Sequence, residues 1–360
     1  MLRIEMLPAG HGDCLWIEYG DRRKPRRILI DGGATGTYKR ALQPKLLTLP
    51  ENERSFELLI VTHIDADHIT GVLELLQDQS TGFKARDIWF NGFRHLPGEA
   101  PDTMGAVQGE KLTTLLVKPG VSWNGAFAQR AVVVPPSGPL PRIELPGGLV
   151  LTLLSPTPEK LVELRPEWEK EVRKAGLDPS FAAPGEMETA EGFELLGVPD
   201  VDALANQPFS EDGAEANGSS VAVLAEFEGR SLLLAGDAHP SVLADAIKRI
   251  EPGRLDSRGR LPVDACKLPH HASKANVSRA LLDTLACKQY LFSTNGAYFR
   301  HPDPQAVARV IKWGGKQPAL AFNYRTKYNE AWASKQLRER HGYAVAYPGA
   351  ESEGMTLELA

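Results

Sequence analysis

Short apolar runs recur along this chain, and most of them end at a glycine, an aspartate, a proline or a histidine. Runs that are rich in Val, Ile, Leu and aromatic residues and are bounded by turn-forming residues are typical of β-strands. The pattern predicts strands at residues 2–7, 14–20, 26–33, 57–63, 87–92, 149–155, 220–229, 231–237, 263–271, 289–294, 319–323 and 343–349.

Other segments repeat their apolar residues with the period of an α-helix. They predict helices at residues 67–78, 158–176, 239–250, 276–286, 303–314 and 330–342. Asp67 and Asp303 stand where helix N-caps would be. Strands come first in pairs and later alternate with helices, which predicts a mixed α/β fold in which helices cover sheets.

Composition and charge narrow the class of protein. The chain has 360 residues and a formal net charge of −5, so it lacks the overall positive charge of a dedicated nucleic-acid binder. Three cysteines without C-x-x-C spacing indicate a reducing compartment. The first residues alternate like a strand rather than a signal peptide, and no apolar run is long enough for a membrane span. We expect a cytoplasmic protein without membrane contact, folded as one domain over residues 1–360.

Residues 157–216 differ in charge from the rest of the chain. They contain 5 Lys and Arg against 15 Asp and Glu, a net of −10, which leaves +5 for the remainder of the −5 total. The pattern indicates an acidic insertion on a more basic core. Two interpretations stay open, a solvated surface excursion and a lid over the functional site.

The stretch VTHIDADHIT, residues 61–70, carries the strongest chemical signal. His63, Asp65, Asp67 and His68 follow an apolar run directly. Alternate side chains of an extended segment share a face, so the first three can converge, while His68 opens a helix. Carboxylates so close together repel unless a cation lies among them, and imidazole and carboxylate are common ligands of divalent metals. The stretch therefore predicts a site for one or two divalent ions.

This stretch resembles the second motif of the metallo-β-lactamase fold, H-x-H-x-D-H, with Asp65 in place of the middle histidine. The variant is similar to that of the hydrolase domain of ComEC-type DNA-uptake proteins and their stand-alone relatives. Further segments resemble that family in the same order: LPAGHGDCLWIEYG, ILIDGG, NGSSVAVLAEFEGRSLLLAGDAH, CKLPHHASKANVS and RHPDP. The resemblance implies a four-layer αββα sandwich with metals at one edge, between the sheets.

The resemblance also assigns metal ligands. One ion would be held by Asp67, His68 and one histidine of the pair His270 and His271, the other by His63 and Asp65, with Asp237 bridging both. The wider fold has a further histidine ligand, but Ser155 stands at the matching strand end, a loss that ComEC-type sequences share. The site of His63 and Asp65 is thus rich in oxygen, which favours Mn²⁺ or Mg²⁺ over Zn²⁺. We expect one or two ions, Zn²⁺ or Mn²⁺.

Other residues receive roles around the ions. Asp67 and His301 are the catalytic candidates, His301 as a proton donor or phosphate ligand. Residues expected behind the ligands are Asp13, Asp31, Ser155 and His239. Candidates for substrate contact are Asn217, Ser273, Tyr324 and Arg325, the last two from an aromatic and cationic stretch that could equally be a capping loop.

Three functions remain open from the sequence. The first is metal-dependent hydrolysis of phosphodiesters in DNA or RNA by a metal-activated water. The second keeps the metals but acts on a small phosphodiester, a lactone or a thioester. The third is a metal-binding regulatory or interaction module with little turnover. The sequence contains neither G-x-S-x-G nor a Gly-rich phosphate loop that would indicate a different chemistry.

Overall fold

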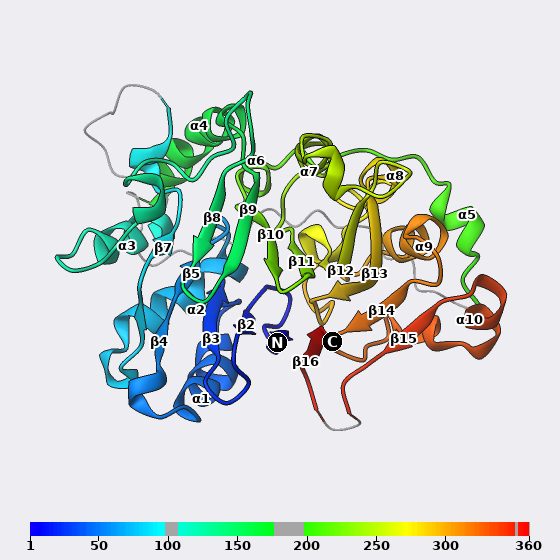
Figure 1. The fold of residues 1–360 in the computed structure, drawn as a ribbon, viewed down its shortest axis with the longest axis horizontal. Coiled ribbons are helices and arrows are strands. Elements are labelled where there is room, and N and C mark those ends of the chain that lie inside the picture. Colours follow the sequence, from blue (N-terminus) through cyan, green and yellow to red (C-terminus); the bar gives the residue numbers. More distant parts are fainter. Residues whose placement is uncertain (98–106, 176–197, 350–351, 360) are drawn as a thin grey trace.

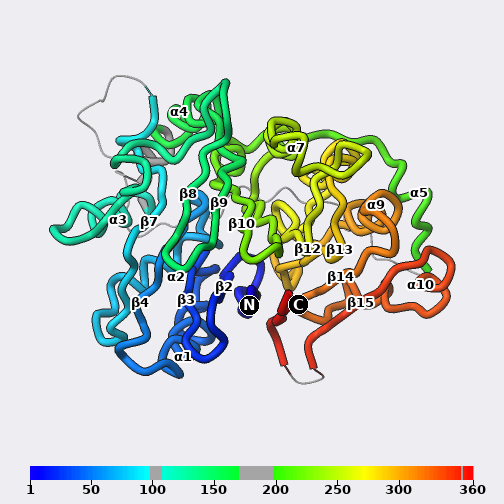
Figure 2. The backbone as a smooth tube through the Cα atoms, in the orientation of Figure 1, coloured from blue at the N-terminus to red at the C-terminus, as the bar shows by residue number. Residues whose placement is uncertain are grey.

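The computed structural model describes residues 1–97, 107–175, 198–349 and 352–359. Two large sheets pack against each other through a shared core and carry helices on their outer faces (Figure 1). The chain passes from the first sheet to the second and returns, so that the two termini meet (Figure 2), where β1 pairs with β16. The predicted four-layer αββα sandwich is confirmed.

The first sheet has six strands in the described part of the chain. Their spatial order is β16 (Met355–Leu359), β1 (Leu2–Met6), β2 (Leu15–Tyr19), β3 (Arg26–Ile30), β5 (Leu58–Ile60) and β7 (Ile88–Trp89). A separate short pair joins β4 (Ser55–Phe56) to β6 (Lys84–Ala85). Because β3 and β5 run parallel, both end at the same edge, where Asp31 and His63 follow them.

The second sheet has eight strands in the described ranges. Their order is β15 (Ala344–Ala346), β14 (Ala319–Phe322), β13 (Leu285–Phe292), β12 (Leu261–Lys267), β11 (Arg230–Leu234), β10 (Ala222–Phe227), β9 (Leu149–Ser155) and β8 (Arg142–Leu145). β11 to β15 are parallel, whereas β8 to β11 pair antiparallel. The loops after β11 and β12 carry Asp237 and His271, which therefore emerge at one edge.

Period-two alternation divides the first sheet between two cores. Leu15 and Ile17 of β2 belong to the core shared with the second sheet, whereas Trp16 between them packs into the core under the outer helices. All three side chains are buried. Since successive strand residues point to opposite faces, this two-sided burial is what a sheet covered on both faces requires.

Ten α-helices occur in the described residues. They are α1 (Gln43–Leu47), α2 (Ala66–Gln77), α3 (Val107–Leu116), α4 (Pro158–Ala175), α5 (Val201–Ala205), α6 (Glu215–Gly218), α7 (Pro240–Lys248), α8 (Arg279–Asp283), α9 (Pro304–Trp313) and α10 (Lys335–His341). Residues of α1 to α4 pack with the first sheet, and α7 to α9 with the second. No helix in the described ranges combines the length and apolarity needed to cross a bilayer.

Several local predictions need correction. The N-cap of α2 is Asp65, so Asp67 lies in the first turn instead; Asp303 does cap α9. The helix predicted at 276–286 ends at Asp283, because the chain enters β13 two residues later. Among the short elements that the sequence pattern missed are β8, which forms a hairpin with β9, and the edge strand β16, which depends on pairing with the distant β1.

The described part of the acidic segment is partly built into the fold. Its residues 176–197 lie outside the described ranges, so the insertion itself stays a prediction. In α4, however, Leu161, Leu164 and Trp168 are buried among residues of the first layer. The beginning of the acidic segment is therefore anchored to the fold by large apolar side chains.

Candidate metal centre

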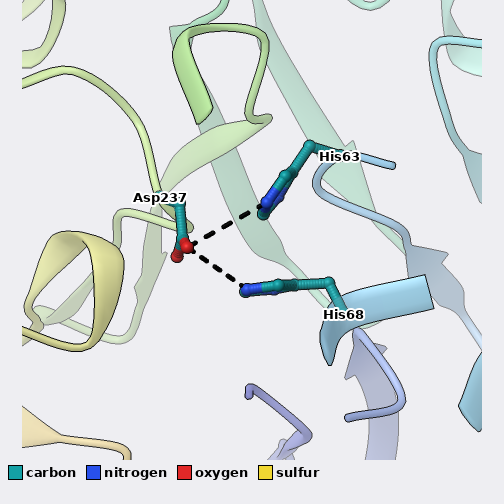
Figure 3. A group of neighbouring side chains, drawn as sticks. All are labelled: His63, His68 and Asp237. Atoms are coloured by element: carbon teal, nitrogen blue, oxygen red, sulfur yellow. Dashed lines mark ion pairs between the residues drawn. The ribbon is translucent and has the colours of Figure 1, made fainter. Parts of the chain in front are cut away.

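Side chains from both sheets converge at the edge where the strands end. His63 comes from the loop after β5, His68 from the first turn of α2, and Asp237 from the loop after β11. Figure 3 shows the two imidazoles pointing toward the carboxylate from the other sheet, with Nε2–Oδ2 distances to Asp237 of 4.0 Å for His63 and 3.3 Å for His68. Potential ligand atoms of His63, His68 and Asp237 lie within 4.8 Å of one another, as do those of Asp67, His68 and His271.

Asp31 fixes the ring of His68. Its Oδ2 lies 2.8 Å from Nδ1 of His68 and also accepts from the Thr62 hydroxyl at 2.7 Å. The other oxygen accepts from the Thr62 backbone N–H at 2.8 Å. Asp31 is fully buried and has a positive φ of 59°. Asp31 thus holds the His68 ring from its Nδ1 side, while Nε2 of the same ring faces the cluster.

The structure separates the two neighbouring histidines. His270 and His271 both have left-handed backbone conformations, with φ of 45° and 51°, and their rings diverge at 72°. Nε2 of His271 faces the cluster, 3.5 Å from carboxylate oxygens of both Asp67 and Asp237. His270 instead turns its Nδ1 to Asp212, 3.2 Å away. His271 is thus the histidine placed to bind a metal, and the assignment of His270 as a ligand is not supported.

His63 occupies the more open end of the cluster. Nδ1 of His63 lies 2.9 Å from the Thr62 hydroxyl and 3.1 Å from the Ser220 hydroxyl, which hold the ring in place. Nε2 of His63 is buried and has no hydrogen-bond partner in the described part of the protein. Its nearest carboxylate is that of Asp65, 3.5 Å away and 42 % exposed. These two residues form the pair that the sequence predicts.

The tautomers of the buried histidines test whether the cluster fits a cation. The backbone carbonyl of Ser293 can only accept, so Nδ1 of His271, 2.8 Å away, carries the proton. Nδ1 of His68 likewise donates to Asp31. In neutral rings both Nε2 atoms then present lone pairs to each other at 3.2 Å. Lone pairs and carboxylates that converge in a buried site require a cation, so the donor set fits divalent metals.

The electrostatics of the free protein agree with this fit. Burial opposes ionisation of Asp237, but the nearby His68 and His271 outweigh it and hold the pKa of Asp237 well below its usual value. Burial also opposes charge on His68, yet Asp237, Asp67 and Asp31 raise its pKa well above the ordinary value. A proton thus occupies the cluster when no metal does, and metal binding must release it.

A buried lysine that the sequence analysis did not assign lies behind the cluster. Lys267 ends β12 with no exposed surface, and its Nζ forms an ion pair with Asp13 and lies 3.8 Å from Asp237. Asp13 in turn lies 3.6 Å from Nδ1 of His271. Asp13 thus lies between Lys267 and His271. The lysine of the CKLPHH segment, at the end of a strand and next to the histidines, was the signal that could have identified it.

Two other residues expected behind the ligands have different surroundings. His239 caps α7, and its Nε2 lies 3.1 Å from the backbone carbonyl of Ala214, so it ties down the acidic segment rather than a ligand. The Ser155 hydroxyl, at the end of β9, is buried without a hydrogen-bond partner in the described residues.

The acidic segment contributes to the rim of the site. Asp212 Oδ2 accepts from Asn217 at 2.7 Å and from Asn276 at 3.1 Å, and it faces His270. Burial lowers the pKa of His270, but the Asp212 partner prevails and raises it to about 9. The sequence missed Asp212 because nothing near it suggests a contact with residue 270. Asn217, through its hydrogen bond to Asp212, supports the pair of Asp212 and His270. The Ser273 hydroxyl accepts a hydrogen bond from the Ala275 N–H and closes the local turn.

The remaining candidates are His301, which borders the site, and Tyr324 and Arg325, which contact other parts of the fold. The ring of His301 is buried and lies 5.5 Å from that of His270. Tyr324 is also buried, and its hydroxyl accepts from the Gly10 backbone N–H at 2.9 Å. The Arg325 guanidinium stacks 4.2 Å from the ring centre of Tyr347. The contacts of Tyr324 and Arg325 are thus those of a structural loop, and their assignment to substrate binding is not supported.

Comparison with known proteins gives partial matches. No family model matches the chain. It is 30 % identical over 128 residues to "Hydroxyacylglutathione hydrolase" of Salmonella paratyphi C (strain RKS4594), which is 35 % of this chain and 46 % of that protein. It is 31 % identical over 121 residues to the protein of the same name from Salmonella newport (strain SL254), 33 % of this chain and 43 % of that one. The chain thus spans less than half the length of these relatives.

Two solved structures align along the chain at low similarity. The diiron beta-hydroxylase CmlA from Streptomyces venezuelae has a TM-score of 0.40 and 14 % identity, over 99 % of this chain and 54 % of that one. The metallo-beta-lactamase fold protein YhfI from Bacillus subtilis has a TM-score of 0.42 and 9 % identity, over 99 % of both chains.

Proposed function

We propose that the protein is a metal-dependent hydrolase that cleaves phosphodiester bonds, in nucleic acid or in a smaller nucleotide. The observation that carries the proposal is the convergence of His68 and His271 Nε2 atoms, 3.2 Å apart, on the carboxylates of Asp67 and Asp237. Such a donor set suits a divalent ion, and His63 with Asp65 supplies the beginning of a second site beside it.

Divalent ions bound there would lower the pKa of a water and neutralise charge that develops on a phosphoryl oxygen. Asp67, His68 and His271 would hold one ion, His63 and Asp65 the other, and Asp237 lies between the two groups. The choice of phosphodiester is supported by the oxygen-rich second group and by the resemblance of the motifs to ComEC-type domains. The same hard donors support Mn²⁺ rather than Zn²⁺ as the activating metal.

The chain's own groups hold this arrangement in place. Asp31 and the Ser293 carbonyl each accept a hydrogen bond from the Nδ1–H of His68 or His271, which keeps the Nε2 lone pairs turned inward. Lys267 offsets the charge of Asp13 and Asp237 from behind. At the rim, burial lowers the pKa of His270, but Asp212 outweighs it and raises that pKa to about 9 in the metal-free protein. A cation beside the metals would attract an anionic phosphodiester.

A second candidate is hydrolysis of a small thioester. It is favoured by the local similarity to proteins named hydroxyacylglutathione hydrolase, which covers about a third of the chain. Both candidates require the same metals, so metal dependence does not separate them.

One assay distinguishes three cases: phosphodiester hydrolysis, thioester hydrolysis, and a metal-binding module without turnover. Metal-free protein is supplied with Mn²⁺ or Zn²⁺ and incubated with single- and double-stranded DNA and RNA, a dinucleotide, and S-lactoylglutathione. The proposal expects cleavage of at least one phosphodiester, abolished by Asp237→Asn. Cleavage of the thioester alone overturns it, and loaded metal without any turnover identifies a binding module.

A further inference from the structure

An aromatic rim borders the metal centre. It consists of His11, Tyr298, Phe299 and His301, from the opening loop and the loop after β13. The rings of His11 and Tyr298 stack at 5.1 Å and 24°, and those of Phe299 and His301 stack at 5.8 Å and 25°. Tyr298 and Phe299 meet edge to face at 4.6 Å and 83°, which joins the two stacks.

The rim is attached to the metal centre at both ends. At one end, Gly12 packs so tightly against Asp67 that an added Cβ would lie 1.8 Å from the Asp67 carbonyl oxygen. His11 precedes this contact in the chain. At the other end, the His301 ring lies 5.5 Å from His270, which adjoins the ligand His271. A molecule resting on the rim would therefore be adjacent to the candidate metal centre.

The loop that carries the two exposed rings is anchored. The Asn295 N–H donates to the Gly10 carbonyl at 2.9 Å, and the Arg300 N–H donates to the Gly296 carbonyl at 3.0 Å. Gly296 has φ of +72°, and a Cβ there would lie 2.3 Å from the Tyr328 ring. The loop is thus held at its base, and the rings are presented on a defined support.

Tyr298 and Phe299 are 43 % and 47 % exposed, and they are the only adjacent aromatic residues among the exposed large apolar side chains of the described ranges. Single exposed apolar residues are ordinary, but an ordered pair beside a reactive centre indicates a ligand surface. Its flat, uncharged faces suit another planar ring. Arg300 follows in the chain, is exposed, and has no ion pair in the described part of the protein, so its charge is available to a phosphate.

From these contacts we infer that the aromatic rim stacks an unpaired nucleobase of the substrate while the adjoining phosphodiester lies at the metals. The inference rests on the proposed function and adds a substrate class, single-stranded nucleic acid. Base–aromatic stacking tolerates any sequence, because every base has a π-face. A duplex hides those faces inside its own stack, so paired substrates would not use the rim.

Stacking can be measured apart from cleavage. The probe is a single-stranded DNA decamer with a central 2-aminopurine, whose fluorescence is quenched when the base stacks. Full-length protein is titrated without metal, and steady-state cleavage is followed with Mn²⁺ on the same strand and on its duplex. The variants are Tyr298→Leu/Phe299→Leu, the conservative Tyr298→Phe, and Phe209→Leu, whose ring is exposed to a similar degree (41 %).

We expect the double variant to lose the quenching and to raise KM for the single strand about tenfold or more at similar kcat and metal content. Tyr298→Phe and Phe209→Leu should behave like the parent, and the duplex should respond little. Unchanged KM and quenching in the double variant overturn the inference even if the parent cleaves DNA. If the parent cleaves no nucleic acid but the double variant still loses quenching, the proposed function fails while the rim stands as a base-stacking surface. A change in oligomeric state of the double variant, without loss of quenching, assigns the rim to self-association instead.

Discussion

The Nε2 atoms of His68 and His271 lie 3.2 Å apart, although these residues are separated by 203 positions in the chain. Nδ1–H of His68 donates a hydrogen bond to Asp31, and Nδ1–H of His271 donates one to the Ser293 carbonyl. In neutral rings, the lone pairs of the two Nε2 atoms therefore face each other in a buried site. This arrangement is unfavourable unless a cation lies nearby. This relationship connects the two sheets and leads to the first prediction.

Replacing Asp237 or His271 with alanine should reduce bound divalent metal by at least one equivalent, because each contributes an atom to the inner group. Metal content is measured by elemental analysis of protein purified without chelator. His341→Ala, at the end of α10, serves as the matched control and should leave it unchanged. Full occupancy in both site variants would refute the ligand assignment.

Asp65→His should shift the metal preference from Mn²⁺ toward Zn²⁺, because imidazole replaces the hard carboxylate beside His63. The ratio of activities with the two metals measures the shift. Asp65→Asn removes the charge without adding an imidazole, so it should weaken activity with both metals. An identical ranking of metals in the parent and Asp65→His would show that this position does not set the preference.

Lys267→Met should lower the free energy of unfolding by about 3–5 kcal/mol, because it leaves the buried Asp13 carboxylate without its partner. Urea unfolding of metal-free protein measures the loss. Lys288→Met removes a cation that is 69 % exposed and pairs with Asp264, and it should change stability by about 1 kcal/mol or less. Adding Asp13→Asn to Lys267→Met should restore part of the loss, and no restoration would contradict a charge effect.

The pairing of Asp212 with His270 should make stability depend on pH. The folded-state pKa of His270, about 9, exceeds its ordinary value of 6.5. Its contribution is therefore fully present below pH 6.5 and is lost as the pH rises through 9. In chelator, Asp212→Asn should be less stable than the parent by about 2 kcal/mol at pH 6, and the difference should shrink toward pH 10. A difference that does not vary with pH would mean that the carboxylate acts only as a hydrogen-bond acceptor.

The sequence alone determined the elements and the chemistry that lies close together along the chain. The positions of most strands could be predicted because a sheet buried on both faces needs continuous apolar runs. The group from His63 to His68 was readable because like charges so near each other require a cation. The sequence also predicts Asp31 and Asp13 beside the site, since each lies in a motif that the resemblance places there.

Only the tertiary structure chose between His270 and His271. The difference between the two depends on left-handed backbone torsions, with φ of 45° and 51°. The residue type histidine does not predict such torsions. The partnership of Asp212 with His270 likewise joins positions 58 residues apart (270 − 212) on a segment that reads as an acidic excursion. The ion pair of Lys267 with Asp13 likewise depends on where β12 ends relative to the opening loop. Pattern and propensity are local, whereas long-range contacts follow from how the two sheets pack, and that packing decides which charged side chains must share one buried site.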